Sequence, residues 1–179
     1  MIPYVRYTRL AADAIRGPKL SPLDELRLPL RVSPADVELT RMNNGRYVTL
    51  MDLGRVGLAL RCGLLAAMIR RRWTPLVGAV SIRYRRSLRL GQAFDLSTRV
   101  TAFDEKFWYF DQRFEAKGEV YASAFVKALF FGPRGSVPAR EMLEAAGAGD
   151  LVSPPIPAPV RSWLASEQAM RSSTPLTVS

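Results

Sequence analysis

Two carboxylates and two amides stand close together in one polar loop of this sequence: Asp36, Glu38, Asn43 and Asn44. The two carboxylates are candidate general bases, because the chain contains no histidine that could serve instead. Without histidine, one chain can assemble neither Ser-His-Asp nor Cys-His catalysis, and the usual histidine-based zinc sites are excluded. A general base must therefore be Asp, Glu, Lys, Tyr or a bound water, and no metal site is expected. Ordinary capping of the helix that follows would explain the same residues without any chemistry.

The single cysteine, Cys62, lies in an apolar helical run and has no histidine to activate it. We therefore expect a small buried side chain at this position rather than a nucleophile. One cysteine cannot form an intrachain disulfide, which fits a reducing compartment and a cytoplasmic protein.

The charge balance is strongly basic, with 26 Lys and Arg against 16 Asp and Glu and a formal net charge of +10. Such a balance favours a nucleic acid, an anionic membrane surface or a phosphorylated small molecule as partner, although a solvated basic surface gives the same number. Nucleic acid is not expected, because no RNA-binding aromatic motif or DNA-reading helix accompanies the charge. Phosphate could be held by guanidinium forks in residues 70–72 or in the set Arg83, Arg85, Arg86 and Arg89.

The apolar pattern predicts a long buried helix directly after the polar loop. One face carries residues at i, i+3, i+4, i+7 and i+11, namely Tyr47, Leu50, Met51, Gly54 and Leu58. Asn43 or Asn44 is the expected N-cap. Gly63 is expected to bend or end this helix, and a second helical piece should run over residues 64–72 and stop before Pro75.

Strands are predicted on both sides of the helical region. Residues 26–32 alternate apolar and basic side chains, and Pro29 among them indicates an edge strand or a bulge. Later strands are predicted at residues 80–84, 94–102, 107–114 and 120–130, with a turn at Lys117-Gly118. One strand, a long helix and about four antiparallel strands give an α+β fold with a helix on an antiparallel sheet.

The last strand has two different faces. Small apolar residues on one face would let a helix approach closely, and the other face carries the partly apolar set Tyr121, Phe125, Leu129 and Phe131. A lone domain would leave this second set partly in water, so we expect a symmetric homo-oligomer, a homodimer or a homotetramer.

The sequence divides into a helical N-terminal extension over residues 1–22, a main domain over 23–146, and a linker with a short helix over 147–179. Residues 1–16 combine an apolar face with basic side chains, which could lie on an anionic membrane or pack on the same domain. We expect their removal to leave the domain folded and to abolish any affinity for anionic vesicles. The longest apolar stretch, residues 56–69, is interrupted by Arg61 and is too short to cross a bilayer.

Residues 36–55 resemble the signature of the thioesterase-like hotdog proteins related to 4-hydroxybenzoyl-CoA thioesterase. Within this group, the residues resemble most the branch that includes the mammalian thioesterase superfamily member 6 type. The residues that match in order and spacing are Asn43, Asn44, Tyr47, Asp52 and Arg55. Residues 78–89, 118–131 and 159–164 also resemble this branch, so the resemblance covers most of the chain.

The resemblance implies a hotdog fold, in which an antiparallel sheet wraps around a long central helix. It also implies an acyl-CoA thioesterase with no cofactor beyond the coenzyme A of its substrate. Glu38 would then be the base or nucleophile, with Asp36 in reserve, while Asn43 and Asn44 shape the loop. The remaining residues implied in substrate binding are Gly45, Arg46, Tyr47, Arg83, Arg85 and Arg86. The backbone amides of residues 44–46 would polarise the thioester carbonyl.

Two departures from the family pattern lie where the family's chemistry takes place. The first is that the histidine before Met-Asn-Asn is missing, either because Arg41 takes its place or because the loop is one residue shorter. The second is that the second acid of the pair is Glu38 rather than Asp. The alternative function is therefore a non-catalytic hotdog protein that binds an acyl group or acyl-CoA, with possible peripheral membrane contact through residues 1–16. Asp52 and Arg55 are expected to pair at i, i+3, although an acid from the facing subunit's helix completes the site in several hotdog families.

Overall fold

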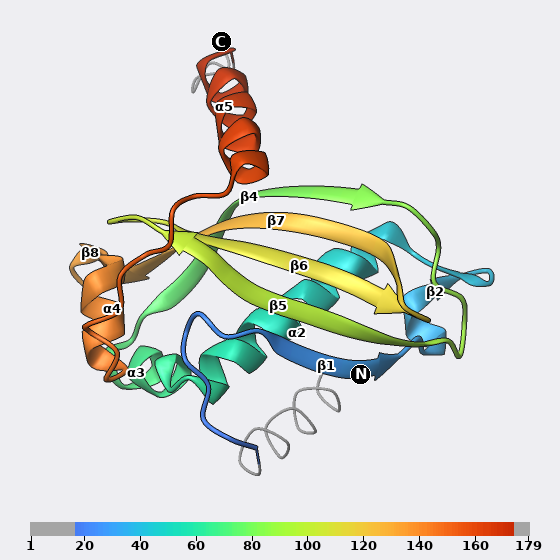
Figure 1. The fold of residues 1–179 in the computed structure, drawn as a ribbon, viewed down its shortest axis with the longest axis horizontal. Coiled ribbons are helices and arrows are strands. Elements are labelled where there is room, and N and C mark those ends of the chain that lie inside the picture. Colours follow the sequence, from blue (N-terminus) through green and yellow to red (C-terminus); the bar gives the residue numbers. More distant parts are fainter. Residues whose placement is uncertain (1–16, 174–179) are drawn as a thin grey trace.

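The computed structural model describes residues 17–173 of the chain (Figure 1). Residues 1–16 and 174–179 lie outside the described residues, so the predicted N-terminal helix and its membrane contact stay predictions. The elements run in the order β1 (Leu26–Arg31), η1 (Pro34–Asp36), β2 (Val37–Glu38), β3 (Arg41–Met42), α2 (Asn44–Arg61), α3 (Leu64–Arg71), β4 (Thr74–Tyr84), β5 (Ala93–Phe103), β6 (Trp108–Ala116), β7 (Glu119–Gly132), β8 (Gly135–Ser136), α4 (Ala139–Ala145) and α5 (Ala158–Ser173).

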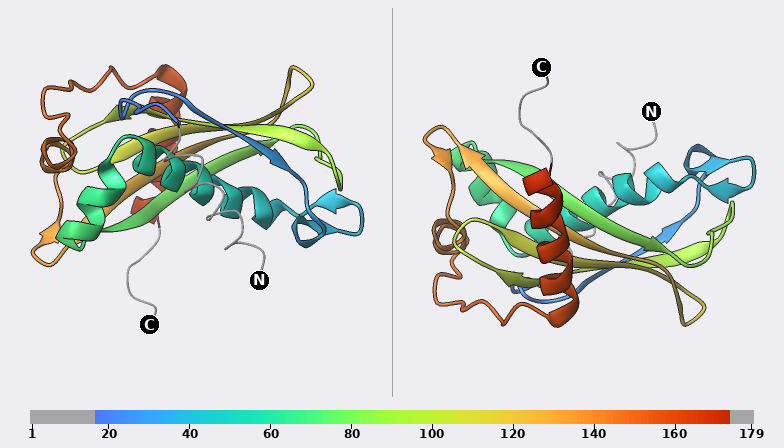
Figure 2. Two further views of the ribbon diagram at one scale, coloured as in Figure 1. Left: turned by 90° about the horizontal axis from the view of Figure 1, so that it is seen from below. Right: turned by 90° about the horizontal axis from the view of Figure 1, so that it is seen from above.

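One antiparallel sheet carries the fold, with strand order β1-β5-β6-β7-β4 and the short β8 paired to β7. The sheet curls around α2, which runs along one of its faces (Figures 1 and 2). A long helix wrapped by an antiparallel sheet is the hotdog arrangement, so the expected fold class is confirmed. Pro29 lies on the edge strand β1, where a residue without an N–H is tolerated.

The other edge strand, β4, begins earlier than the alternation of residues 80–84 predicts. It starts at Thr74, so that Pro75 pairs with Phe130 instead of marking the end of a helix. The second helix ends at Arg71 because Arg72 adopts a left-handed backbone conformation with φ of 57°. Its start is the left-handed Gly63, with φ of 83°, which confirms the predicted break after α2.

Helix α2 packs against the sheet most closely at Gly54. A Cβ atom at this position would overlap Thr98 Oγ1 of β5 and lie 2.9 Å from Gln112 Nε2 of β6. The close approach therefore comes from a glycine on the helix facing β5 and β6. We had expected it from the small residues on the inner face of β7, which are buried but do not make the nearest contact.

Cys62 caps the C-terminal end of α2 and is buried, as expected for a small apolar side chain. Burial raises the pKa of its thiol. The thiol therefore stays protonated at neutral pH, which argues against a role as a nucleophile.

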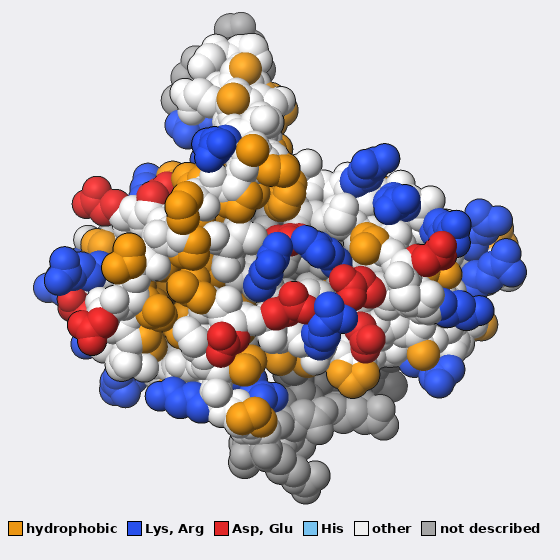
Figure 3. Space-filling model, viewed as in Figure 1, with side chains coloured by type: hydrophobic (Ala, Val, Ile, Leu, Met, Phe, Trp, Pro, Cys, Tyr) orange, Lys and Arg blue, Asp and Glu red, His pale blue; other side chains and the backbone are white. Residues whose placement is uncertain are grey.

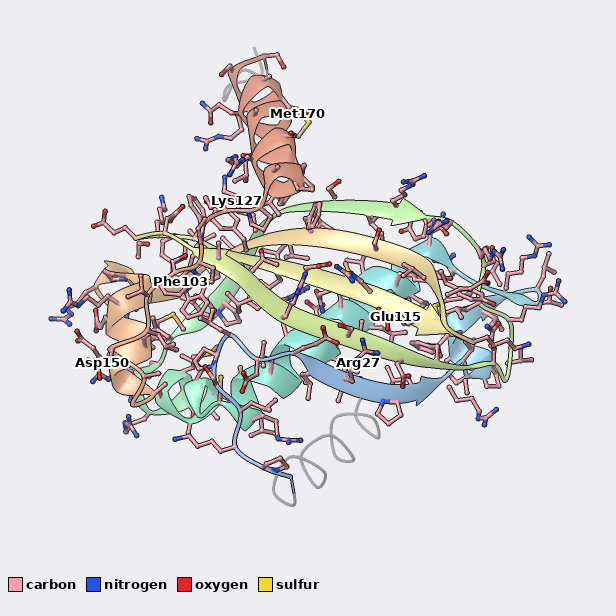
Figure 4. The ribbon with its side chains drawn as sticks, in the orientation of Figure 1. Arg27, Phe103, Glu115, Lys127, Asp150 and Met170 are labelled. Carbon is pink, nitrogen blue, oxygen red and sulfur yellow. The ribbon has the colours of Figure 1, made fainter. Side chains whose placement is uncertain are left out.

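The C-terminal helix α5 is 16 residues long, and it covers part of the sheet face opposite α2 (Figure 2). Hydrophobic side chains gather where α5 meets the sheet (Figure 3), and the Trp163 ring stacks on Phe125 with centroids 6.2 Å apart. Beside them, Lys127 Nζ lies 2.9 Å from Glu167 Oε2 and 4.3 Å from the centroid of the Phe107 ring (Figure 4). Part of the outer apolar set that we expected to meet a partner chain is therefore covered by the same chain.

Within residues 17–173, no helix is both long enough and apolar enough to span a membrane.

Replacing Gly54 by alanine should test the close approach of α2 to the sheet. Alanine favours a helix by about 1 kcal/mol over glycine, but overpacking against Thr98 and Gln112 costs about 1–3 kcal/mol. We expect a net loss of about 1 kcal/mol in the free energy of unfolding, measured by urea denaturation. Thr98→Ala in the same protein should recover part of this loss, because it removes the hydroxyl that the new methyl group meets. Equal or greater stability of Gly54→Ala would contradict the close packing.

Candidate functional site

The polar loop before α2 is a short hairpin. Strands β2 and β3 pair Glu38 with Arg41, and Leu39 stands at the tip in a left-handed conformation with φ of 59° and 96% of its surface exposed. Backbone hydrogen bonds fix the hairpin to the turn before β5, from the Met42 amide to the Leu88 carbonyl at 2.8 Å and from the Leu90 amide to the Thr40 carbonyl at 3.1 Å. The loop therefore has a defined position relative to both α2 and the sheet.

Asn43 links Glu38 to the N-terminus of α2. Its Oδ1 accepts a hydrogen bond from the Gly45 amide at 2.8 Å, which makes it the N-cap of the helix. Its Nδ2 donates to Glu38 Oε2 at 2.7 Å. The amide side chain thus holds an exposed carboxylate at the positive end of the helix dipole.

Asp36 has a different environment from Glu38. It is only 4% exposed, and its Oδ2 accepts hydrogen bonds from the Ser33 amide at 2.8 Å and the Ser33 hydroxyl at 2.7 Å. Its backbone carbonyl accepts from the Asn43 amide at 2.9 Å. Asp36 therefore organises the turn that leads to the hairpin, while Glu38 is the carboxylate with access to solvent.

The amides at the start of α2 are partly used within the protein. The Gly45 amide donates to the Asn43 side chain, and the Arg46 amide donates to the Asn43 carbonyl at 2.9 Å. We had expected the amides of residues 44–46 to act together on a thioester oxygen. Two of them already have acceptors, and within the described part of the chain the Asn44 amide is left as the donor that a substrate could use. The Asn44 carbonyl accepts a hydrogen bond from the Tyr84 hydroxyl at 3.1 Å.

Tyr47 lies in the core rather than on a surface that a substrate could reach in this structure. It is 1% exposed, its hydroxyl accepts a hydrogen bond from the Leu88 amide at 3.1 Å, and its ring packs edge-on against Tyr84 and Phe114. Burial raises the pKa of its hydroxyl. Its place on the apolar helical face was the signal in the sequence for this structural role.

A basic cleft of about 1040 Å³ lies at the hairpin end of the molecule, where Lys and Arg side chains gather (Figure 3). The basic residues in its lining are Arg31, Arg41, Arg86, Arg89 and Lys117. Of the arginines expected to bind substrate or its phosphates, Arg86 and Arg89 line the cleft, and Arg86 is ion-paired with Glu119. Arg83 and Arg85 are exposed outside the lining. Arg41 and Arg89, which form a backbone bridge, bring together positions that are distant in the sequence.

A polar network lies under the middle of α2. Arg55 pairs with Asp52, as expected at i, i+3, and also donates to Gln112 Oε1 at 2.6 Å. Gln112 Nε2 in turn donates to the Met51 carbonyl at 2.9 Å and to Thr98 Oγ1 at 2.8 Å. Asp52 and Arg55 also line a second, smaller cavity of about 140 Å³, whose other walls are mostly apolar.

The described residues contain no group of three or more Cys, Asp and Glu side chains placed to hold a metal ion. The chemistry available at the hairpin is therefore that of a carboxylate, a helix N-terminus and nearby cations.

Comparison with known proteins gives consistent matches. The family model described as "Thioesterase-like superfamily" matches residues 32–164. Protein THEM6 of Danio rerio is 37% identical over 142 residues, which cover 77% of this chain and 69% of that protein. Protein THEM6 of Xenopus laevis is 39% identical over 94 residues, which cover 52% of this chain and 45% of that protein.

Two solved structures illustrate the likeness in fold. SAV2348 from Staphylococcus aureus, determined in complex with CoA, aligns with a TM-score of 0.63 at 12% identity. The alignment covers 91% of this chain and 100% of that one. Slr0204, a 1,4-dihydroxy-2-naphthoyl-CoA thioesterase from Synechocystis, aligns with a TM-score of 0.61 at 12% identity over 72% of this chain and 98% of that one.

The Asn43 side chain offers a direct test of the site's architecture. Asn43→Ala should lower the free energy of unfolding by about 1 kcal/mol, because α2 loses its N-cap and Glu38 loses its hydrogen-bond donor. Asn43→Ser is the matched control, since a serine hydroxyl can still cap the helix and should restore most of the stability. Both are measured by urea denaturation. If Asn43→Ala is as stable as the unmodified protein, the bridging role of this side chain is wrong.

Proposed function

Because the chain belongs to the thioesterase-like superfamily, we propose that it hydrolyses an acyl-CoA thioester with Glu38 as the catalytic carboxylate. The observation that carries the proposal is the link from Glu38 through the Asn43 side chain to the N-terminus of α2. Through this link the Glu38 carboxylate would serve as the base beside the helix N-terminus, and the Asn44 amide would serve as the hydrogen-bond donor for an oxyanion. Thioester hydrolysis needs both groups, together with a means of holding coenzyme A.

The reaction would proceed by activation of water. Glu38 takes a proton from a water molecule, whose oxygen forms a bond with the thioester carbonyl carbon. The carbonyl oxygen becomes an oxyanion beside the Asn44 amide and the helix N-terminus, which stabilise the negative charge. The carbon–sulfur bond then breaks, and the sulfur receives the proton from Glu38. The products are a carboxylic acid and the free thiol of coenzyme A.

The basic cleft would hold the phosphates of coenzyme A. Arg41 belongs to the same hairpin as Glu38, and Arg89 is bridged to it through the backbone, so the phosphate contacts and the carboxylate share one rigid support. Guanidinium groups bind phosphate oxygens in pairs of parallel hydrogen bonds. The structure of SAV2348 with CoA supports this class of ligand for the fold.

A second candidate function is the binding of acyl-CoA without hydrolysis. It is favoured by the internal use of the Gly45 and Arg46 amides, which leaves fewer donors for an oxyanion. The absence of the family's loop histidine favours it as well.

We also propose that the functional unit is at least a dimer that forms through β4. Among residues 17–173, this strand is an unpaired edge of the sheet, and it has exposed apolar side chains, including Leu76 at 52% exposed and Val77 at 41%. Exposed edges of this kind readily pair with another strand. A cytoplasmic location and contact of residues 1–16 with a membrane stay predictions.

Glu38→Gln should lower the rate of thioester hydrolysis by about 10²–10⁴-fold, because the amide keeps the shape of the side chain and cannot accept the proton. Binding of the same acyl-CoA, measured by calorimetry, should change little. Thiol release is followed over a panel of acyl-CoAs of different chain length. Asp150→Asn, an exposed carboxylate at the other end of the molecule, is the matched control (Figure 4).

The buried carboxylate gives a second comparison. Asp36→Asn should affect hydrolysis less than Glu38→Gln, because its oxygens already serve Ser33. If Asp36→Asn lowers the rate of hydrolysis more than Glu38→Gln does, the catalytic carboxylate has been assigned to the wrong residue. Tight binding of acyl-CoA by the unmodified protein without thiol release from any chain length would establish the non-catalytic function instead.

Light scattering should give at least twice the mass of one chain at micromolar concentration. Val77→Arg, which places a charge on the exposed edge of β4, should shift the protein toward the monomer. A monomer at all concentrations in the unmodified protein would rule out the proposed assembly.

A further inference from the structure

The Tyr84 hydroxyl lies beside the first residue of the central helix. Tyr84 is the last residue of β4, and its hydroxyl donates a hydrogen bond to the Asn44 carbonyl at 3.1 Å. The backbone amide of the same Asn44 is the donor that the hairpin site leaves for a substrate within residues 17–173. A second donor, on a side chain, therefore stands next to the donor on which the proposed hydrolysis depends.

Packing holds the ring of Tyr84 and leaves part of it open to solvent. The ring lies edge-on against the buried Tyr47 ring, with centroids 5.3 Å apart. The amide of the next residue, Arg85, donates to the Tyr121 carbonyl of β7 at 2.8 Å, so the backbone is held as well. Tyr84 is nevertheless 40% exposed, so a substrate can reach it from solvent.

The hydroxyl is available as a donor in its present environment. Partial burial raises the pKa of Tyr84, so the proton stays on the oxygen at neutral pH. Its present acceptor is the carbonyl of the first residue of α2, which the helix already uses for a backbone hydrogen bond one turn along. The hydroxyl can therefore turn to another acceptor without leaving that carbonyl unpaired.

The distances allow one substrate oxygen to accept from both donors. Three covalent bonds of about 1.2–1.5 Å each separate the Asn44 nitrogen from the Asn44 carbonyl oxygen. The Tyr84 hydroxyl, 3.1 Å from that oxygen, thus lies no more than about 7 Å from the nitrogen. An oxygen that accepts two hydrogen bonds of about 3 Å joins donors up to about 6 Å apart. A small rotation of the phenol closes any remaining gap.

We propose that Tyr84 is a second catalytic hydrogen-bond donor, which acts with the Asn44 amide on the carbonyl oxygen of the thioester. The inference rests on the proposed function, because it concerns the same acyl-CoA site. When the water oxygen bonds to the carbonyl carbon, an electron pair of the C=O bond moves onto the carbonyl oxygen, which both donors then stabilise. The pair returns when the carbon–sulfur bond breaks, and Tyr84 keeps its proton throughout.

The first test is kinetic. Tyr84→Phe removes the hydroxyl and keeps the ring against Tyr47. We expect kcat for thiol release from octanoyl-CoA to fall by about 10²–10³-fold, the usual effect of losing one oxyanion donor. KM should change little, because the neutral carbonyl of the bound thioester is a weaker acceptor than the oxyanion. Tyr109→Phe is the matched control, since it removes a hydrogen-bonded hydroxyl beside α5 and should leave kcat unchanged.

The second test needs no hydrolysis. The probe is the ketone analogue of octanoyl-CoA in which a methylene group replaces the thioester sulfur, with ¹³C at the carbonyl. The carbonyl resonance of the bound probe moves to higher frequency with each hydrogen bond that the oxygen accepts. We expect this resonance to lie at lower frequency in Tyr84→Phe than in the unmodified protein. In Tyr109→Phe it should match the unmodified protein.

The two tests separate a donor from a structural tether. If Tyr84 only ties β4 to the start of α2, Tyr84→Phe lowers the stability toward urea and leaves the carbonyl resonance unchanged, a result that overturns the proposal. An unchanged kcat in Tyr84→Phe overturns it as well. If the unmodified protein releases no thiol but the resonance still depends on Tyr84, the proposed hydrolysis fails and the assignment of the donor holds.

Discussion

The close contact between the central helix and the sheet at Gly54 is the constraint on which the other features depend. Because this residue has no side chain, α2 can lie against Thr98 and Gln112 without displacing either. The contact fixes the height of the helix above the sheet, and Gln112 then reaches the Met51 carbonyl and holds Arg55. The N-terminus of α2 is thereby held beside the hairpin, and the other half of the helix closes the apolar cavity.

The hairpin site follows from this placement through local polar contacts. Asn43 satisfies one of the free amides at the helix start and holds Glu38 with the same side chain. Asp36 supports the preceding turn and receives the Asn43 amide through its carbonyl. Asp36 therefore shapes the loop, and Glu38 is exposed to solvent. The sequence alone does not distinguish the two residues, and their different burial in the structure does.

Local signals in the sequence predicted much of the fold. The N-cap at Asn43 is one of two predicted candidates, and the edge strand at Pro29 is one of two predicted alternatives, while Gly63 was predicted as a bend or an end. The β2–β3 hairpin was not predicted, because its turn uses Leu39 in a left-handed conformation that the residue type does not signal. The basic cleft was predicted only in part. Arg86 and Arg89 belong to the set expected to hold phosphate, but Arg31 and Arg41 join them only when β1, the hairpin and the turn before β5 meet.

The position of α5 limits how the sheets of two molecules can meet. Sheets that stack face to face lie about 10 Å apart, and a helix with its side chains is itself about 10 Å wide. With α5 seated over Phe125 and Lys127, another sheet cannot reach that part of the outer face. A back-to-back tetramer would first have to release the helix and expose Val160, at about 1.5–3 kcal/mol for that side chain alone. The C-terminal helix therefore blocks face-to-face stacking of two sheets over this region, and it leaves the edge strands accessible for contact between two molecules.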